Sequence, residues 1–283
     1  MVPRGKVRGG QGRGDWYGAS MASLRRLIVS ACDGASALLE RTGLRLLRSQ
    51  RGRAVSVRLT QDLWREIESE RYAGAIFLAK AAVAADPTWG EGHRALALAN
   101  LRKGNVAQAR AAYQAGIGAA PDDPLLPAAL GDLEWEQGQF VQAEAAYRRA
   151  LEREPPPGET PKFLLNLAWA VCEQGRLDEA ESLLREARER APEDTGLLLT
   201  LGHVELRQGR YAQAERTFRT TITRDPASAH AHYGLGYALA GRRSWREALT
   251  EVRGVVERAP DNAEYHRFLS GLERQMEGAD RPN

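Results

Sequence analysis

Histidine and cysteine are the side chains of this chain best suited to bind a metal ion or act as a nucleophile, and both are rare. The five histidines are His93, His203, His230, His232 and His266, and the two cysteines are Cys32 and Cys172. His230 and His232 are two residues apart, so in a helix they point to different sides. The cysteines lack the CxxC spacing of a zinc site. We therefore predict no metal site and no cofactor, and we expect both cysteines to be buried free thiols.

Carboxylates are more numerous, but none lies in a pattern typical of a catalytic pair. One acidic run is interspersed with arginines, which is typical of a solvated helix face with ion pairs between neighbouring turns; it contains Glu179, Glu181, Glu186 and Glu189. The sequence also contains no phosphate-binding loop and no nucleophile elbow. We predict a non-catalytic protein without a small-molecule substrate.

Residues of the same type recur at a regular interval along the chain, and this pattern indicates the elements that carry these side chains. When the repeats are written one below another, each recurring residue forms a column. Each step between successive alanines of the first column is 34 residues, except one of 37, and the column consists of Ala75, Ala109, Ala143, Ala180, Ala214 and Ala248. A proline follows each alanine after twelve residues; these are Pro87, Pro121, Pro155, Pro192, Pro226 and Pro260. Such a period predicts a repeat protein, in which each repeat buries its core against its neighbours.

The columns resemble those of the tetratricopeptide repeat. Counted from the start of each repeat, they place a large apolar residue at position 7, small residues at 8 and 20, glycine at 15, an aromatic residue at 24 and proline at 32. The resemblance covers about residues 56–277. It implies an all-α fold, a right-handed α-solenoid of about six helix-turn-helix repeats with helical caps at both ends.

Each column has a physical reason. Position 15 joins the two helices of a repeat, where a residue with left-handed backbone ends the first helix. Four repeats have glycine there (Gly104, Gly138, Gly175 and Gly209), whereas Glu70 and Arg243 occupy it in the first and sixth. Positions 8 and 20 are expected where the two helices approach most closely. The proline at 32 ends the second helix, and Asp123, Asp194 or Ser228 then caps the next first helix.

These columns divide most of the chain into repeats. The predicted repeats are residues 56–89, 90–123, 124–157, 161–194, 195–228 and 229–262, followed by a C-terminal capping helix at 263–277 and a disordered tail at 278–283. The first repeat is degenerate, and its apolar face is carried by Leu59, Leu63, Trp64 and Ile67 instead. Between the third and fourth repeats, three additional residues lengthen a proline-rich turn.

The N-terminal region differs from the repeats in charge. The net charge of the chain is +3, yet residues 1–55 alone contain eleven arginines and lysines and three acids. Residues 1–20 are rich in glycine and arginine and are expected to be disordered; because the stretch is short, we do not expect it to bind nucleic acid. Residues 21–55 have leucines at helical spacing beside arginines, which indicates a basic amphipathic helical segment. It either caps the first repeat or docks on an anionic membrane surface.

The resemblance also implies where a partner would bind. In the family, the first helices line a concave groove, and positions 2, 5, 9, 12 and 13 face a bound peptide. Here these positions are rich in aromatic residues and leucine, and the candidates are Arg94, Trp135, Leu165, Trp169, Leu199, His203, Leu206, Tyr233 and Tyr237. Aromatic anchors in sheltered pockets often supply much of the binding energy of an interface. The alternative is that these side chains fill the core between repeats.

Together these observations predict a non-catalytic, cytoplasmic scaffold or adaptor that holds an apolar or aromatic peptide segment of a partner protein in its groove. The rival hypothesis keeps the fold but makes the protein a membrane-surface assembly or secretion accessory factor that docks through residues 21–55. A chaperone-tail adaptor is not expected. Lys162 and Asn166 match two positions of the family's chaperone clamp, but Asp132 stands where a companion basic or amide residue is needed.

Overall fold

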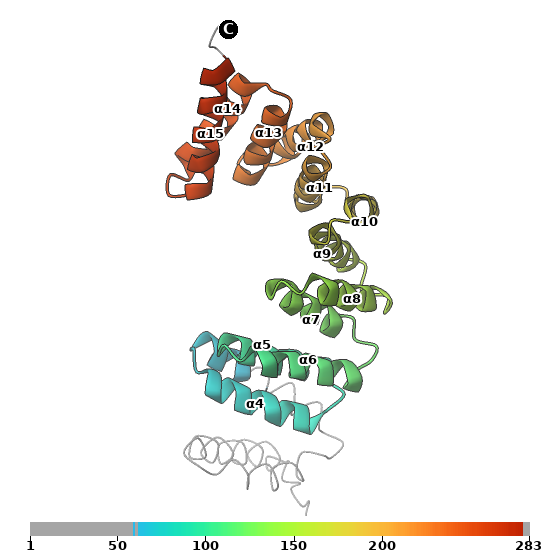
Figure 1. Cartoon of the computed structure of the whole chain (residues 1–283). Helices are drawn as coiled ribbons and strands as arrows, with labels where there is room; N and C mark the ends of the chain where they lie inside the picture. The colour runs from blue at the N-terminus through green and yellow to red at the C-terminus, as the bar shows by residue number, and fades with distance from the viewer. Residues whose placement is uncertain (1–58, 60–61, 280–283) are drawn as a thin grey trace, which may run out of the picture. The chain divides into compact units, whose positions relative to one another are not determined.

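A computed structural model describes Leu59 and residues 62–279, and this part of the chain consists of helices joined by short turns, without β-strands (Figure 1). Residues 62–68 are helical and precede twelve further helices. Their bounds are α4 Tyr72–Ala85, α5 Gly90–Arg102, α6 Val106–Ala119, α7 Leu125–Glu136, α8 Phe140–Leu151, α9 Thr160–Glu173, α10 Leu177–Arg190, α11 Thr195–Arg207, α12 Tyr211–Arg224, α13 Ala229–Gly241, α14 Trp245–Arg258 and α15 Ala263–Ala279. The expected all-α repeat architecture is confirmed. The tail predicted at 1–20 and the amphipathic segment predicted at 21–55 lie outside the described residues.

The chain divides into two compact units, Met1–Ala112 and Tyr113–Asn283, and the boundary falls within α6. In the described part of the first unit, residues 62–68 pack with α4 and α5. Leu63 and Ala75 are fully buried there, and Trp64 and Ile67 pack partly buried against them. The degenerate first repeat therefore keeps an apolar core through the residues that the sequence suggested.

The turn between the two helices of each repeat has left-handed backbone at position 15. The four glycines predicted there have positive φ angles, between 71° at Gly138 and 84° at Gly104. Glu70 and Arg243, which stand in place of glycine, adopt the same conformation with φ of 57° and 63°. This conformation strains a side chain with a Cβ atom, so the fold imposes the turn on these two residues.

The packing of the helix pairs explains the alanine column. All six alanines at position 20 are fully buried. Position 8 was expected to be small because the two helices of a repeat approach closely there. The structure adds that the side chain at position 24 of the second helix fills the space next to position 8. A Cβ atom added to Gly131 would lie 2.7 Å from the Tyr147 ring, and one added to Gly202 would lie 2.7 Å from the Phe218 ring. Glycine at position 8 thus makes room for an aromatic ring of the same repeat.

Hydrogen bonds fix the links between repeats. Asp194 caps α11 by accepting from the backbone N–H groups of residues 196 and 197, and Ser228 caps α13 in the same way through residue 231. Histidine recurs at position 4, counted from the start of a repeat or of the capping helix, and its ring bonds to the proline that ends the preceding repeat. The Nε2 atom of His93 lies 2.9 Å from the Pro87 carbonyl oxygen, and that of His266 lies 2.7 Å from the corresponding oxygen of Pro260. These histidines are therefore structural.

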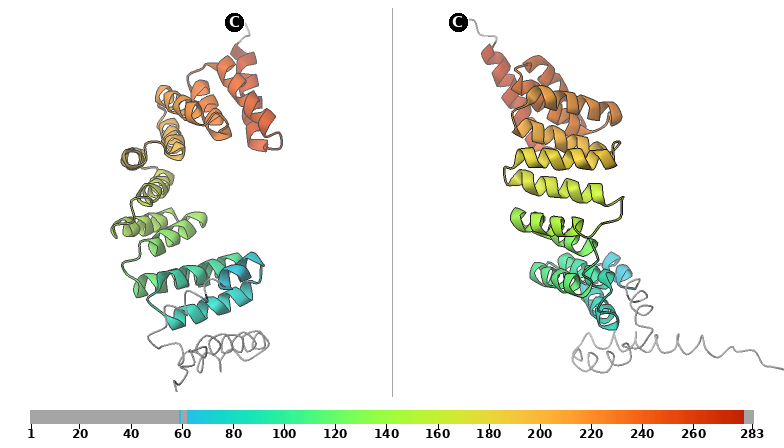
Figure 2. Two further views of the ribbon diagram at one scale, coloured as in Figure 1. Left: turned by 180° about the vertical axis from the view of Figure 1, so that it is seen from behind. Right: turned by 90° about the vertical axis from the view of Figure 1, so that its right-hand side faces the viewer.

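Within the second unit, the helices follow one another in chain order along a curve (Figures 1 and 2). The first helices of the repeats (α7, α9, α11 and α13) follow the inner side of this curve, and the second helices (α8, α10, α12 and α14) follow its outer side. Successive first helices contact one another, α7 with α9, α9 with α11 and α11 with α13. The helix α15 packs beside α14 at the C-terminal end. The first helices of this unit thus form a continuous inner surface.

Among the described residues, no helix is both long enough and apolar enough to cross a membrane.

Candidate functional site

An open pocket lies where α7 meets α9, two first helices of the second unit. Its volume is about 410 Å³, within the range of about 300–1,000 Å³ that is usual for ligand pockets. It is lined by Asp132, Trp135, Glu136, Tyr147, Asn166 and Trp169. The first three come from the C-terminal half of α7, Tyr147 comes from α8, and the last two lie one turn apart on α9. The pocket therefore joins two consecutive repeats.

A carboxylate with two neutral donors forms the polar part of the pocket. The Tyr147 hydroxyl donates to Oδ1 of Asp132 at 2.7 Å, and Nδ2 of Asn166 donates to the same oxygen at 3.1 Å. Asp132 is exposed as a whole residue, but partial burial of its carboxyl group raises its pKa, and the two hydrogen bonds oppose this effect only in part. Burial also raises the pKa of the Tyr147 phenol, as does the charge of Asp132, so the hydroxyl stays protonated and remains a donor.

Two tryptophans form the aromatic part of the pocket. Trp135 is 40% exposed, and its ring meets the edge of Phe140 at a centroid distance of 6.3 Å. Trp169 is half-buried, and its ring lies 6.2 Å from that of His203 on the next first helix. His203 in turn packs edge-on against Phe218, and burial lowers the pKa of its imidazole, with a smaller contribution from His230. Trp169 and His203 thus continue the aromatic surface from α9 to α11.

The three leucines predicted to face a partner serve the core as well. Leu165 packs against the core cluster of the third to fifth repeats, whereas Leu199 and Leu206 pack against the cluster of the fifth and sixth. All three remain half-buried rather than enclosed. Each of them therefore serves the core and stays partly accessible.

The two tyrosines of the sixth repeat have different surroundings. Tyr237 is 41% exposed and stacks on Phe268 of α15 at a centroid distance of 3.8 Å. Tyr233 is only 8% exposed, because it packs against Tyr265 and Phe268, and its hydroxyl donates to Glu264 at 3.1 Å. The capping helix thus covers Tyr233. We therefore correct the candidate set: Tyr233 is a core residue, whereas Tyr237 remains exposed.

Arg94 lies on α5, in the first unit. Its guanidinium forms an ion pair with Glu91 one turn earlier at 2.6 Å, and both side chains are about one-third exposed. The positive charge of Arg94 is therefore partly balanced by a neighbouring acid.

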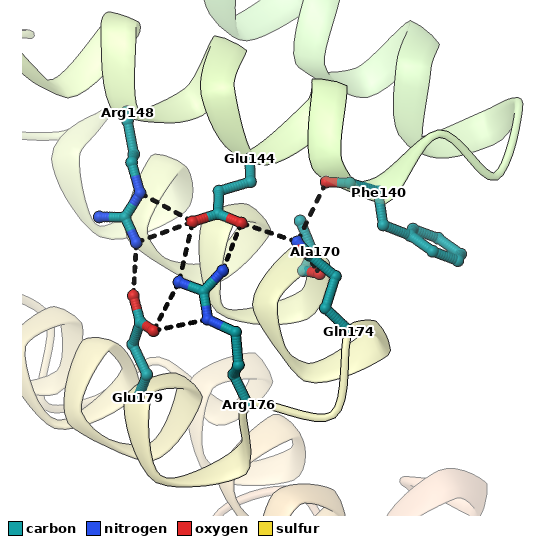
Figure 3. A network of polar contacts seen from close by, with 7 residues as sticks. All are labelled: Phe140, Glu144, Arg148, Ala170, Gln174, Arg176 and Glu179. Carbon is teal, nitrogen blue, oxygen red and sulfur yellow. Dashed lines mark hydrogen bonds and ion pairs between the residues drawn. The ribbon is translucent and has the colours of Figure 1, made fainter.

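A network of polar contacts that we did not predict from the sequence joins α8 to α10 and to the turn before α10 (Figure 3). Glu144 of α8 is 9% exposed and accepts from Arg176, in the turn of the next repeat, at 2.7 and 2.9 Å. Arg148 also donates to Glu144, at 2.9 Å, and Gln174 donates at 2.7 Å. Glu179 completes the network by pairing with both arginines. These contacts link the third repeat to the fourth.

The surroundings of Glu144 strongly favour its charged form. Burial alone would raise the pKa of this carboxyl, but the donors Arg176, Gln174 and Arg148 outweigh burial and lower it from 4.5 to about 2. The carboxylate is therefore ionised at any pH near neutrality, and its role is to hold adjacent repeats together.

The same arrangement recurs at position 21 of the next two repeats. Glu181 accepts from Arg185 at 2.5 Å and from Arg210 of the following turn at 2.8 Å. Glu215 pairs with Arg219 at 3.1 Å and also with Arg242. Our prediction that Glu181 lies on a solvated helix face was wrong, since its side chain is 7% exposed.

The described residues contain no group of three or more histidine, cysteine or acidic side chains that could hold a metal ion. Cys172 is fully buried and has no disulfide partner. Burial raises the pKa of its thiol, so it is a poor nucleophile. Cys32 lies outside the described residues.

A family model of the tetratricopeptide repeat matches three segments of the chain, residues 64–124, 128–195 and 199–263. Each segment spans about two of the repeats assigned from the alanine columns. No curated protein sequence matches the chain.

Solved structures with the same fold share little sequence with the chain. The structure of PilW, a widely conserved type IV pilus biogenesis factor, superposes with a TM-score of 0.66 at 18% identity and covers 76% of this chain and 98% of its own. The pilF protein of Pseudomonas aeruginosa gives a TM-score of 0.64 at 14% identity, covering 77% and 98%. YrrB, a TPR protein with an unusual peptide-binding site, gives 0.54 at 16% identity, covering 67% and 96%. At these identities, the likeness concerns the fold.

Proposed function

The chain belongs to the tetratricopeptide repeat family, and we propose that it is a non-catalytic scaffold that holds an extended segment of a partner protein on the inner surface of its second unit. The family and its structural neighbours support a protein-interaction role in general. The position of the binding surface and the nature of the segment are our own inference.

One observation supports this proposal: aromatic side chains of the first helices remain accessible instead of closing into the core. Trp135 and Tyr237 are each about 40% exposed, and Trp169 with His203 lies between them along the chain. Large apolar side chains on a soluble surface often mark interaction sites. The half-buried leucines beside them provide apolar contacts. A partner segment with apolar or aromatic side chains would fit this surface.

Two of the structural neighbours are compatible with such a role. YrrB is a TPR protein with a peptide-binding site, and PilW is a biogenesis factor. By analogy, we propose that this chain recruits or positions a component of a larger assembly. Fold alone does not determine function, so the proposal depends on the surface residues.

The proposal is tested with the double variant Trp169→Ala and Tyr237→Ala as bait in affinity capture from native lysate. We expect this variant to lose proteins that the wild-type chain retains, while its far-ultraviolet circular dichroism stays unchanged. Tyr211→Ala is the matched control, because Tyr211 is 38% exposed but lies at the start of a second helix. If the double variant captures the same proteins as Tyr211→Ala, the inner surface is not the binding site.

A second proposal concerns the basic residues 21–55, whose leucines at helical spacing and excess of arginine favour an anionic membrane surface. Co-sedimentation with phosphatidylglycerol vesicles, with and without residues 1–55, tests it. Vesicle binding that does not depend on this segment would contradict it, as would the absence of binding.

A further inference from the structure

The charge of the pocket between α7 and α9 does not match an apolar ligand. Two of its six lining residues, Asp132 and Glu136, are acids, and the others are neutral. In the part of the chain that the structure describes, neither acid forms an ion pair. The partners of Asp132 are a hydroxyl and an amide, both uncharged. The pocket therefore offers two acidic side chains without a cationic partner among the described residues.

The one lysine of α9 and the one arginine of α11 form ion pairs with other acids. Lys162 pairs with Glu159 at 3.1 Å, and Arg207 pairs with Glu173 at 2.7 Å. They do not neutralise Asp132. An apolar side chain entering the pocket would cover the carboxylates without giving them a partner, and such desolvation is unfavourable. A cation would compensate for the displaced water.

The aromatic walls favour the same kind of ligand. Trp135 and Trp169 line the pocket together with the carboxylates, and the face of an indole ring attracts a cation. A guanidinium group is planar, so it can stack on an indole while its N–H groups donate to a carboxylate. An ammonium group is more compact and more strongly hydrated, and it stacks less well.

From this arrangement we propose that the pocket between α7 and α9 binds an arginine side chain of the partner segment, with the guanidinium beside Trp135 and Trp169 and its N–H groups directed to Asp132 and Glu136. This inference rests on the proposed function, since it assigns one side chain of the segment held on the inner surface. The leucines and Tyr237 would contact the apolar residues that flank this arginine. Tyr147 and Asn166 would keep the Asp132 carboxylate in place without neutralising it.

The inference can be tested with short peptides as probes. The peptide acetyl-Gly-Arg-Gly-amide is titrated into the full chain, and the indole N–H signals of Trp135 and Trp169 are followed by nuclear magnetic resonance. Citrulline, the uncharged isostere of arginine, replaces arginine in a second peptide, and norleucine or phenylalanine replaces it in others. We expect the arginine peptide to shift both indole signals and to leave that of Trp245 unchanged. The citrulline peptide should bind at least about tenfold more weakly.

Variants of the chain complete the test. Asp132→Asn keeps the shape of the side chain and should weaken the arginine peptide about tenfold. Asp178→Asn is the matched control and should have no effect, since Asp178 lies on α10 outside the pocket and its side chain is 90% exposed. Equal affinity for arginine and citrulline, or an unaffected Asp132→Asn variant, would overturn the inference.

The peptides also separate this inference from the function on which it rests. If the norleucine or phenylalanine peptide shifts the Trp169 signal and the arginine peptide does not, the inner surface binds apolar segments and the arginine assignment is wrong. If no peptide shifts either indole signal, both the assignment and the proposed binding surface are wrong.

Discussion

Replacing Glu144 by glutamine tests how the repeats are held together. The substitution keeps the size of the side chain but removes the charge that Arg148 and Arg176 share. The two guanidinium groups then lose one of the two carboxylates that pair with both of them, and the Arg148–Glu179 ion pair still links the third repeat to the fourth. We expect a large loss of stability for a single atom exchange on the outer side of the protein.

The magnitude follows from the pKa of the carboxyl. Lowering it from 4.5 to about 2 corresponds to about 3 kcal/mol of stabilisation at pH 7. Both arginines are more than one-third exposed, at 43% and 41%, so water screens part of the attraction. We therefore expect Glu144→Gln to lower the free energy of unfolding by about 2–3 kcal/mol. Because the pKa is depressed in the folded state, this contribution is complete above about pH 4.5 and is lost as the pH falls towards 2.

The assay is urea unfolding followed by circular dichroism at pH 7 and at pH 3. At pH 3, the difference between wild type and Glu144→Gln should fall below half of its value at pH 7. Glu186→Gln is the control, because Glu186 and Arg190 form an ion pair on the same side whose side chains are both 46% exposed; it should cost less than about 0.5 kcal/mol. If Glu144→Gln costs no more than the control, or its cost does not change with pH, the account of this network is wrong.

Three further predictions concern the repeat turns and helix contacts, and each is checked by urea or thermal unfolding. Arg243→Gly should raise the free energy of unfolding by about 0.5–1 kcal/mol, because the φ angle of 63° at this position suits glycine. Gly209→Ala should lower it by about 1 kcal/mol for the same reason. Effects of the opposite sign would contradict the assigned turn. Gly202→Ala should cost about 1–3 kcal/mol, because its methyl group would lie 2.7 Å from the Phe218 ring. Ala180→Arg should cost more than about 3 kcal/mol, since residue 180 is fully buried, and an unchanged melting curve would refute the repeat register.

Most of the fold could be predicted from the sequence because the repeated columns reflect contacts within one repeat. The alanines at position 20 are buried in every repeat, and the turn at position 15 keeps its conformation even at Glu70 and Arg243. Such contacts recur with the period of the chain, so one sequence displays them several times. They can be recognised without knowing how the repeats pack together.

The site was predicted less completely, because it depends on contacts between elements that do not repeat. Position 5 faces the inner surface in the family, but α15 covers Tyr233 at the end of the stack. The capping helix itself was predicted. Which side chains the capping helix covers depends on how α15 packs beside α13 and α14. This packing occurs once in the chain, so no repeated pattern in the sequence predicts it.

The ion-pair network on the outer side was missed for a related reason. Glu181 has an arginine four residues later, which is typical of an exposed helix face, yet it also meets Arg210 of the next turn. A signal was present in the sequence: glutamate recurs at position 21 as Glu144, Glu181 and Glu215. In the repeats that follow Glu144 and Glu181, position 16 is an arginine, Arg176 and Arg210. Comparing the repeats with one another would therefore have predicted both ion pairs.

Site-specific photo-crosslinking can show whether the inner surface holds a partner segment. A benzophenone amino acid is placed at position 237 on the inner surface or at position 211 at the start of α12, where the native tyrosines are 41% and 38% exposed. After illumination in native lysate, we predict a crosslinked partner from position 237 and none from position 211. Crosslinks from position 211 alone, or from neither position, would contradict the claim.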